Sequence, residues 1–140
     1  MLAAEFNVAA MTPADYDDVM DLWNACEGVR VNESLEELTR ILRRNPGLST
    51  VVRRGEHVVA AVLCCHDGRR GYLYHLGVAA EFRQRGLASQ LVDHCLERLK
   101  AEGISRCSIF LIVGNESGEA FWRRTGWRER SDLKTFARDF

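Results

Sequence analysis

The sequence predicts an α/β (α+β) fold in which helices flank a central sheet. Apolar residues recur at helical spacing in four segments, and runs rich in β-branched and aromatic residues lie between those segments. At 140 residues, with 46% hydrophobic and 28% charged residues, the chain is expected to form a single domain, 1–140, around one core. The predicted order of elements is β-α-α-β-β-β-α-β-α-β-β.

Composition narrows the expected partners and compartment. A net charge of −1 gives no electrostatic reason to expect nucleic acid or a membrane as a partner. The N-terminus carries an early Glu5 and no basic segment, so a signal peptide is not expected. No apolar run approaches the ~20 residues that cross a bilayer. We therefore expect a complete, cytoplasmic protein.

The cysteines predict neither a disulfide framework nor a metal site, because they are odd in number and lack Cys-x-x-Cys spacing. We expect all five to be small buried apolar residues in a reducing compartment. They are Cys26, Cys64, Cys65, Cys95 and Cys107.

The N-terminal half is predicted to form a strand, two helices and a three-stranded meander. Thr12-Pro13 is typical of an N-cap followed by proline at the first helical position, and Ser34 with Glu37 forms a capping box. The second helix is expected to bury Leu35, Leu38, Ile41 and Leu42. The predicted segments are a strand over Glu5–Met11, helices from Thr12 to about Cys26 and from Ser34 to Asn45-Pro46-Gly47, and strands over Ser49–Arg53, His57–His66 and Tyr72–Val78.

The C-terminal half begins with the strongest amphipathic helix pattern, from Gly86 to Gly103. Its buried stripe is expected to be Leu87, Ala88, Leu91, Val92, Cys95, Leu96 and Leu99. The unbroken apolar run Cys107–Val113 predicts a strand covered on both faces. The remaining predictions are a helix over Glu116–Thr125 ended by Gly126, and closing strands over Trp127–Arg130 and Leu133–Arg138.

The stretch from Leu76 to Ala88 joins a strand to a helix N-terminus through a charged glycine turn. The first N–H groups of a helix lack internal partners and its dipole is positive there, so such a turn binds anions. Gly86 lacks the Cβ that would block close approach, and Arg83 and Arg85 add charge, which suits a pyrophosphate. The chain has neither the Gly-Lys-Ser/Thr of a Walker A loop nor a G-x-G-x-x-G fingerprint.

This turn, Arg83-Gln84-Arg85-Gly86-Leu87-Ala88, resembles the acetyl-coenzyme A motif Arg/Gln-x-x-Gly-x-Gly/Ala of the GNAT N-acetyltransferase superfamily. A second stretch, from Asn115 through Ala120-Phe121-Trp122 to Gly126-Trp127, is similar to the family's Asn-x4-Ala-hydrophobic-Tyr-x3-Gly-Phe. The resemblance covers nearly the whole chain. It implies the GNAT fold, with a mixed, mostly antiparallel sheet, and acetyl-coenzyme A as the cofactor.

The resemblance also implies how the cofactor is held. A bulge, for which Gly77 is suited, splays the strand so that pantetheine pairs along its edge, and the Val78 N–H acts as oxyanion donor. Asn115 is expected to contact the cofactor as well as to cap a helix. The implied cofactor residues are Leu76, Val78, Arg83, Gln84, Arg85, Gly86, Leu87, Ala88, Ser89, Asn115, Phe121 and Trp122, with the backbone N–H groups from Gln84 to Ser89 on the pyrophosphate.

The chain departs from the family at the acid and at the base. Trp122 stands where the family has a tyrosine acid, and Phe110 stands where some relatives have a glutamate base. Strand alternation predicts that His75 points away from Leu76 and is structural. The candidates for the base stay open: Tyr72 or Tyr74, on the face of Leu76 and acting through a water, and Glu27 or Glu33 from the loop between the first two helices.

The predicted function is acetyl transfer from acetyl-coenzyme A to a primary amine by direct attack. The acceptor is a small metabolite, a drug-like amine or a protein N-terminus, and a homodimer is compatible with this function. The alternative is a non-catalytic acyl-coenzyme A binding or sensing module, which Trp122 and Phe110 favour. A nucleotide-binding protein would need a phosphate loop that the sequence lacks.

Overall fold

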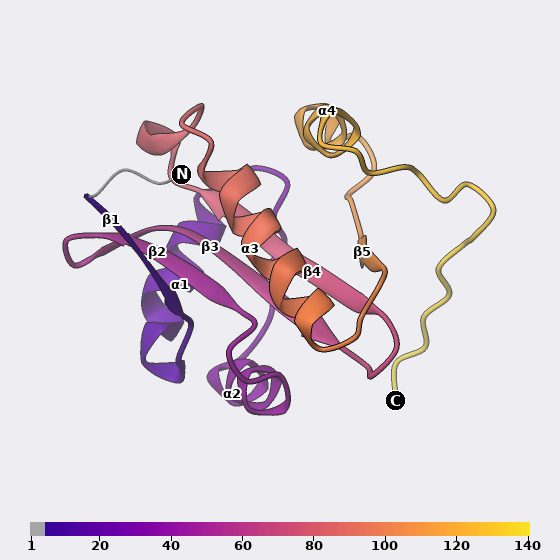
Figure 1. Ribbon diagram of the computed structural model, residues 1–140, viewed down its shortest axis with the longest axis horizontal. Coiled ribbons are helices and arrows are strands. Elements are labelled where there is room, and N and C mark those ends of the chain that lie inside the picture. Colours follow the sequence, from indigo (N-terminus) through magenta and orange to yellow (C-terminus); the bar gives the residue numbers. More distant parts are fainter. Residues whose placement is uncertain (1–4) are drawn as a thin grey trace.

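The structure is a computed structural model that describes residues 5–140, and its centre is a five-stranded sheet with helices on both faces (Figure 1). The strands lie across the sheet in chain order, antiparallel except for the parallel pair β4 and β5. The mixed, mostly antiparallel sheet is therefore confirmed. The strands are β1 (Phe6–Ala10), β2 (Thr50–Arg54), β3 (His57–His66), β4 (Gly71–Val78) and β5 (Cys107–Ile109).

Three of the four α-helices begin where the sequence signals predict, whereas the predicted start at Thr12-Pro13 is a 3₁₀ turn and the first α-helix follows from Tyr16. The Ser34 hydroxyl accepts from the Glu37 N–H at 3.1 Å, and the Ser34 N–H donates to the Glu37 carboxylate at 3.0 Å, which confirms the capping box. No helix within residues 5–140 is long and apolar enough to cross a membrane. The helices are α1 (Tyr16–Asn24), α2 (Leu35–Arg44), α3 (Leu87–Ala101) and α4 (Glu116–Arg124), with 3₁₀ turns η1 (Pro13–Asp15) and η2 (Ala80–Phe82).

One face of the sheet is covered by α1 and α2. Trp23 and Leu38 are fully buried there against Val51 and Leu63 of the sheet. Leu35 is 49% exposed, so its predicted burial is wrong. It occupies the first position of α2, where the helix has not yet turned its apolar stripe onto the sheet.

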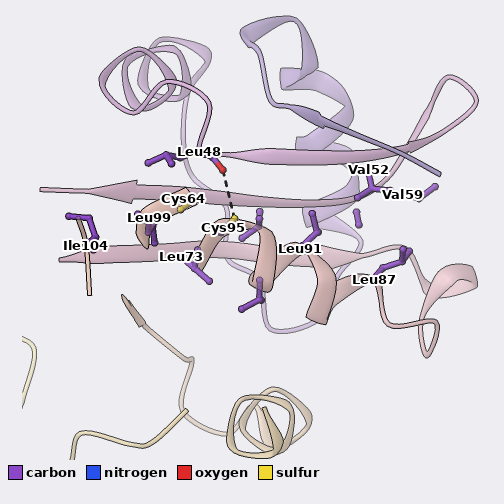
Figure 2. Packing of buried hydrophobic residues seen from close by; sticks show 13 residues of the cluster. Leu48, Val52, Val59, Cys64, Leu73, Leu87, Leu91, Cys95, Leu99 and Ile104 are labelled. Atoms are coloured by element: carbon purple, nitrogen blue, oxygen red, sulfur yellow. Dashed lines mark hydrogen bonds between the residues drawn. The ribbon is translucent and has the colours of Figure 1, made fainter. Parts of the chain in front are cut away.

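The other face is covered by α3, whose predicted stripe, with the exception of Ala88, packs on β2, β3 and β4 (Figure 2). The Cys95 thiol donates to the Leu48 carbonyl at 3.7 Å, the dashed line in the figure. Cys26, Cys64 and Cys95 are buried as expected, whereas Cys65 and Cys107 are half-buried, and all five are free thiols. Helix α3 is thus anchored along its length, and its N-terminus is fixed relative to β4.

The last third of the chain differs from the prediction. Strand β5 has three residues instead of the run Cys107–Val113, and Phe110 beyond it is 61% exposed. Neither Trp127–Arg130 nor Leu133–Arg138 forms a strand. A turn forms between the two segments, at Ser131-Asp132, and there the Arg130 guanidinium binds the Asp132 carboxylate at 3.0 Å. A strand completes its backbone hydrogen bonds on a neighbouring strand, and within residues 5–140 neither segment has one.

Candidate functional site

The predicted anion turn lies between β4 and α3 and is made of backbone. Gly86 is the N-cap of α3 in the left-handed conformation, with φ of 79°, and Gln84 also has a positive φ of 61°. The Gly86 carbonyl accepts the first intrahelical bond, from the Gln90 N–H at 3.1 Å. Among residues 5–140, no hydrogen-bond acceptor faces the N–H groups of Leu87, Ala88 or Ser89. These groups can bind an anion.

The arginine side chains of the turn are already engaged with the protein. The Arg83 Nε donates to the Val78 carbonyl at 3.1 Å. The Arg85 guanidinium lies 5.2 Å from the centre of the Phe82 ring and 3.8 Å from the Glu5 carboxylate. Both are exposed, so each supplies charge near the turn without being fixed on a ligand.

A bulge lies in β4, one step from where the sequence analysis placed it. Gly77 pairs with Ala61, and the register then shifts so that His75 and Leu76 together face one residue of β3, Val62. The prediction of the bulge at Gly77 is therefore wrong. A Cβ on Gly77 would lie 3.0 Å from the Trp23 ring, so this glycine instead allows α1 to pack close to the strand.

The bulge leaves the backbone of His75 in a rare conformation. Its φ is 56°, in the left-handed region that costs a residue with a side chain roughly 1–2 kcal/mol. Because the extra residue also breaks strand alternation, Leu76 and Val78 pack on the α3 face, whereas Tyr74 packs on the α1 and α2 face. The expectation that Tyr74 shares a face with Leu76 is wrong for the same reason.

Beyond the bulge, one edge of β4 is open. The pairing of β4 with β5 ends at Leu73, and among the described residues Tyr74 to Val78 pair only with β3. The Ala79 N–H donates to the Val59 carbonyl at 2.8 Å, so the next pair, Val78 with Ala60, is of the non-hydrogen-bonded type. The N–H of Val78 therefore points away from β3, toward the open edge, where it can bind an extended ligand.

Three aromatic rings lie where β4 and β5 separate. The centres of the Tyr72, Tyr74 and Phe110 rings are 6.2–6.3 Å apart, and the planes lie within 27° of one another. Burial, with a smaller contribution from the neighbouring Cys65, raises the pKa of Tyr74 to about 12. Its phenol is therefore protonated at neutral pH and can donate a hydrogen bond, but it is a poor base.

Glu33 and His75 form a half-buried pair against α1. The His75 Nε2 lies 2.9 Å from both carboxylate oxygens, and the side chains are 13% (His75) and 19% (Glu33) exposed. The Tyr16 hydroxyl donates to the Glu33 carbonyl at 2.8 Å, and the His75 ring packs 5.2 Å from that of Trp23. Burial alone would raise the pKa of Glu33, but the hydrogen bond and charge of His75 outweigh it and lower that pKa. His75 thus points away from Leu76, as strand alternation predicts, but its contact with the candidate base Glu33 is not predicted by the sequence.

The loop between α1 and α2 reaches the start of α4. The Asn115 Oδ1 accepts from the Gly118 N–H at 3.0 Å, which confirms its capping role. A Cβ on Gly28 would overlap the Asn115 amide, so the loop and this asparagine are in close contact. Glu27 is exposed and makes no hydrogen bond within residues 5–140, and the structure does not bring it to the pair.

Trp122 lies on α4 in an aromatic group. Its ring meets Phe121 at 5.0 Å and Trp127 at 4.8 Å, both edge to face, and all three rings pack at the margin of the α3 core. The indole thus has a packing role already, whatever else it contacts.

A cavity of about 380 Å³ lies beside the turn but lacks the chemistry for a pyrophosphate. It is bounded by α1, the β2–β3 hairpin and η2, and Arg83 is its one residue from the predicted cofactor set. The carboxylates that line it are Asp18, Asp21, Glu56 and Glu81, which would repel an anion. Within residues 5–140 no cluster of His, Cys, Asp and Glu could hold a metal ion.

Comparison with protein families identifies a match over most of the chain. The acetyltransferase (GNAT) family matches residues 16–127. This range runs from the start of α1 to just beyond α4, so it contains the glycine turn, the open edge of β4 and the loop that carries Glu33.

Solved structures share the fold. An aminoglycoside acetyltransferase from an uncultured soil metagenomic sample, in complex with trehalose, is 14% identical over 100% of this chain and 99% of that chain, with a TM-score of 0.75. A ribosomal-protein-alanine N-acetyltransferase from Brucella melitensis biovar Abortus 2308 is 15% identical over 96% and 99%, with a TM-score of 0.72. N-acetylglutamate synthase from Neisseria gonorrhoeae, complexed with coenzyme A and N-acetyl-glutamate, is 18% identical over 88% of this chain and 28% of that chain, with a TM-score of 0.69.

Proposed function

Because the chain belongs to the acetyltransferase (GNAT) family, we propose that it transfers the acetyl group of acetyl-coenzyme A to a primary amine, by direct attack of the amine on the thioester. One observation carries this proposal. The N-terminus of α3, with its unpartnered N–H groups, lies at the end of the strand whose edge is open from Tyr74 to Val78. A ligand with a pyrophosphate and an extended amide arm fits both features together.

The cofactor residues of this proposal divide into two groups. The N–H groups from Gln84 to Ser89 bind the pyrophosphate, and the open edge of β4 pairs with the pantetheine amides. The Val78 N–H, which points away from β3, donates to the thioester oxygen. Charge that develops on that oxygen during attack is stabilised by a donor already in place.

The acceptor amine enters from the α1 and α2 face. There the Tyr72, Tyr74 and Phe110 rings offer apolar contact, and the Glu33 carboxylate attracts a cationic amine. Ring faces and a carboxylate favour an amine with an apolar or aromatic body over a strongly anionic one. Both a small molecule and a protein N-terminus satisfy this description.

Release of coenzyme A needs little acid help. Trp122 has no proton to give at the position of the family's tyrosine. A thiol with a pKa near ~8.5 leaves as a thiolate far more easily than an alkoxide would. The absence of this acid is therefore compatible with turnover.

Turnover with a panel of amines tests the proposal. The purified protein is mixed with acetyl-coenzyme A and an aminoglycoside, an arylalkyl amine or a peptide with a free N-terminal alanine. Release of the thiol and the acetylated product are both measured. We expect coenzyme A to raise the Tm and at least one amine to give product. A raised Tm with no product from any amine would instead support a binding module.

A further inference from the structure

We propose that His75, held by Glu33, accepts the proton of the attacking amine; this rests on the acetyl transfer proposed above. The pair stands at the bulge of β4, beside the edge proposed for the thioester arm. It comes from two segments that lie 42 residues apart in the chain. Glu33 acts through His75 and is a positioning residue.

The hydrogen bonding of His75 leaves one ring nitrogen free. Both oxygens of Glu33 lie 2.9 Å from Nε2, and a carboxylate only accepts, so Nε2 carries the hydrogen. In the neutral ring Nδ1 is then an acceptor, and no donor within residues 5–140 binds it. A histidine whose tautomer is fixed by a carboxylate is a well-known arrangement for a general base.

The carboxylate is itself held in place. Glu33 immediately precedes the Ser34 cap of α2, and its carbonyl accepts from the Tyr16 hydroxyl of α1 at 2.8 Å. The Trp23 ring packs 5.2 Å from the imidazole on the side of α1. Two helices thus fix the pair, as a catalytic geometry requires.

The backbone of His75 gives a second, independent reason. A histidine with a φ of 56° in a strand is strained, and such residues concentrate at functional sites. The bulge that imposes this φ also turns the ring onto the α1 face, against Glu33.

The other candidates for the base are weaker. The Tyr74 phenol keeps its proton at neutral pH, because its pKa is raised to about 12. Glu27 is exposed and unconnected to the aromatic rings. The Glu33 oxygens already bind His75, and its lowered pKa makes its carboxylate a poor proton acceptor. No carboxylate binds the Tyr72 hydroxyl within residues 5–140, whereas the carboxylate on His75 fixes its hydrogen on Nε2 and leaves Nδ1 as an acceptor.

The proton balance closes without another reactant. His75 Nδ1 takes one proton from the ammonium group of the acceptor and returns it to solvent. The neutral amine forms the C–N bond, and the C–S bond breaks with its electron pair on sulfur. The amide nitrogen then loses a second proton, which matches the one that the thiolate gains. The products are the N-acetyl amine and coenzyme A.

The charged and titratable groups around the pair come from each neighbouring element. Tyr16 belongs to α1, Cys26 follows it and lies against Gly77, Glu37 belongs to α2, and Tyr74 precedes His75 in β4. The pKa of Glu37 is lowered by its hydrogen bonds to Ser34, and that of Glu33 is lowered as described above, so both carboxylates are charged near neutral pH. A fall of kcat/KM toward low pH, the acid limb of the pH profile, is therefore assigned to His75.

The test compares variants that keep the backbone with a matched control. Asparagine tolerates a positive φ, so His75→Asn removes the imidazole while retaining the bulge. Glu33→Gln removes the carboxylate charge and keeps the shape. His66→Asn is the control, since His66 makes the same contact with Glu102, 2.9 Å, away from the site. We measure kcat, KM for the amine, coenzyme A affinity and the pH profile of kcat/KM.

We expect His75→Asn to lower kcat/KM by roughly 10²–10⁴-fold and to abolish the acid limb, with coenzyme A affinity little changed. Glu33→Gln should lower kcat less and move the acid limb to lower pH, because the imidazolium loses a stabilising charge. A residue that only supports the fold would not move the limb. His66→Asn should behave as the unsubstituted protein does.

Two outcomes overturn this role of His75 while leaving the function intact. One is a His75→Asn protein that keeps its acid limb or loses less than about threefold in kcat/KM. The other is a His75→Asn protein in which coenzyme A affinity falls along with the rate. If the unsubstituted protein binds coenzyme A and acetylates no amine, the proposed function fails first, and the role of His75 with it.

Discussion

The two ends of the candidate site offer different chemical groups, backbone at one end and side chains at the other. At the proposed cofactor end, the groups offered to a ligand are backbone N–H groups of one continuous stretch, 84–89, at the start of a long, well-packed helix. At the acceptor end, the groups are side chains from separate segments: the loop before α2, the bulge in β4 and the chain just after β5. The first end depends on conformation, whereas the second depends on residue identity.

This difference predicts opposite sensitivities to substitution. Removing a side chain at the cofactor end leaves its backbone donors in place, so only a change of backbone should matter. Removing a side chain at the acceptor end removes the contact itself. Binding of coenzyme A and binding of the amine should therefore respond to different variants.

The largest effect is expected from Gly86→Val. A β-branched residue at a φ of 79° is strained, and its side chain blocks approach to the donors. Loss of one or two bonds to a charged phosphate should weaken coenzyme A binding by roughly 30–100-fold. The matched control is Gly103→Val, since Gly103 has a φ of 85° beyond the other end of α3. Both variants should lose stability, but only Gly86→Val should lose the coenzyme A-dependent rise in Tm; equal affinity would refute the turn as the phosphate site.

Phe110→Ala should separate the two ends. It removes one ring of the aromatic group and nothing from the turn, so the KM for the amine should rise by about tenfold with coenzyme A affinity unchanged. Phe136→Ala is the control, because Phe136 is 90% exposed and far along the chain from the rings. A loss of coenzyme A affinity in Phe110→Ala would show that the rings belong to the cofactor end.

Trp122→Tyr should have a smaller effect. It installs the family's phenol where the chain has an indole, so kcat should be unchanged or a few-fold higher. If the indole also packs on pantetheine, coenzyme A binding should weaken by on the order of 1 kcal/mol. Trp127→Tyr is the comparison, since Trp127 shares the packing at 4.8 Å but not the motif position. A drop of more than about tenfold in kcat at saturating cofactor would contradict both expectations, because neither gives the indole a part in the chemical step.

The smallest effect is expected from Arg83→Ala and Arg85→Ala. Both guanidinium groups are exposed and already contact protein groups, so each should weaken coenzyme A binding by about threefold, and only at low salt. Arg40→Ala, an exposed arginine of α2 paired with Glu36, controls for net charge. A collapse of binding at high salt in either variant would show that side chains, and not backbone, hold the phosphate.

The sequence predicted correctly the elements whose ends are determined by a few neighbouring residues. The Ser34 capping box, the stop at Asn45-Pro46-Gly47 and the helix from Gly86 are each determined within a few residues, and each is confirmed. The strands predicted over Trp127–Arg130 and Leu133–Arg138 do not form, because a strand also needs a hydrogen-bonded partner strand, which local sequence does not determine. From Trp127 onward the chain has no partner strand within the described residues, so neither predicted strand forms.

In the candidate site, too, features set by neighbouring residues could be predicted and features set by distant residues could not. The glycine turn could be predicted because a glycine before an amphipathic helix marks both a left-handed residue and a free N-terminus. His75 points away from Leu76, as strand alternation predicts, but the extra residue of the bulge places Tyr74 on the same face as His75, which alternation along a regular ladder does not predict. Glu33 was among the candidates, but no local signal links it to a residue 42 positions later. Because glycine is common in bulges, the sequence predicts the bulge at Gly77, whereas in the structure the left-handed residue of the bulge is a histidine.

The left-handed histidine also bears on how this protein can be engineered. Replacing a left-handed residue with glycine is one route to a more heat-resistant protein, because glycine adopts a positive φ without the strain that a side chain brings. At position 75 that route would remove the imidazole together with the strain. A library selected for thermal resistance alone should therefore accumulate glycine there, whereas one selected for turnover should retain histidine. A position at which the two selections choose different residues is one where activity costs stability. Such a comparison would identify it without a bound ligand or a structure.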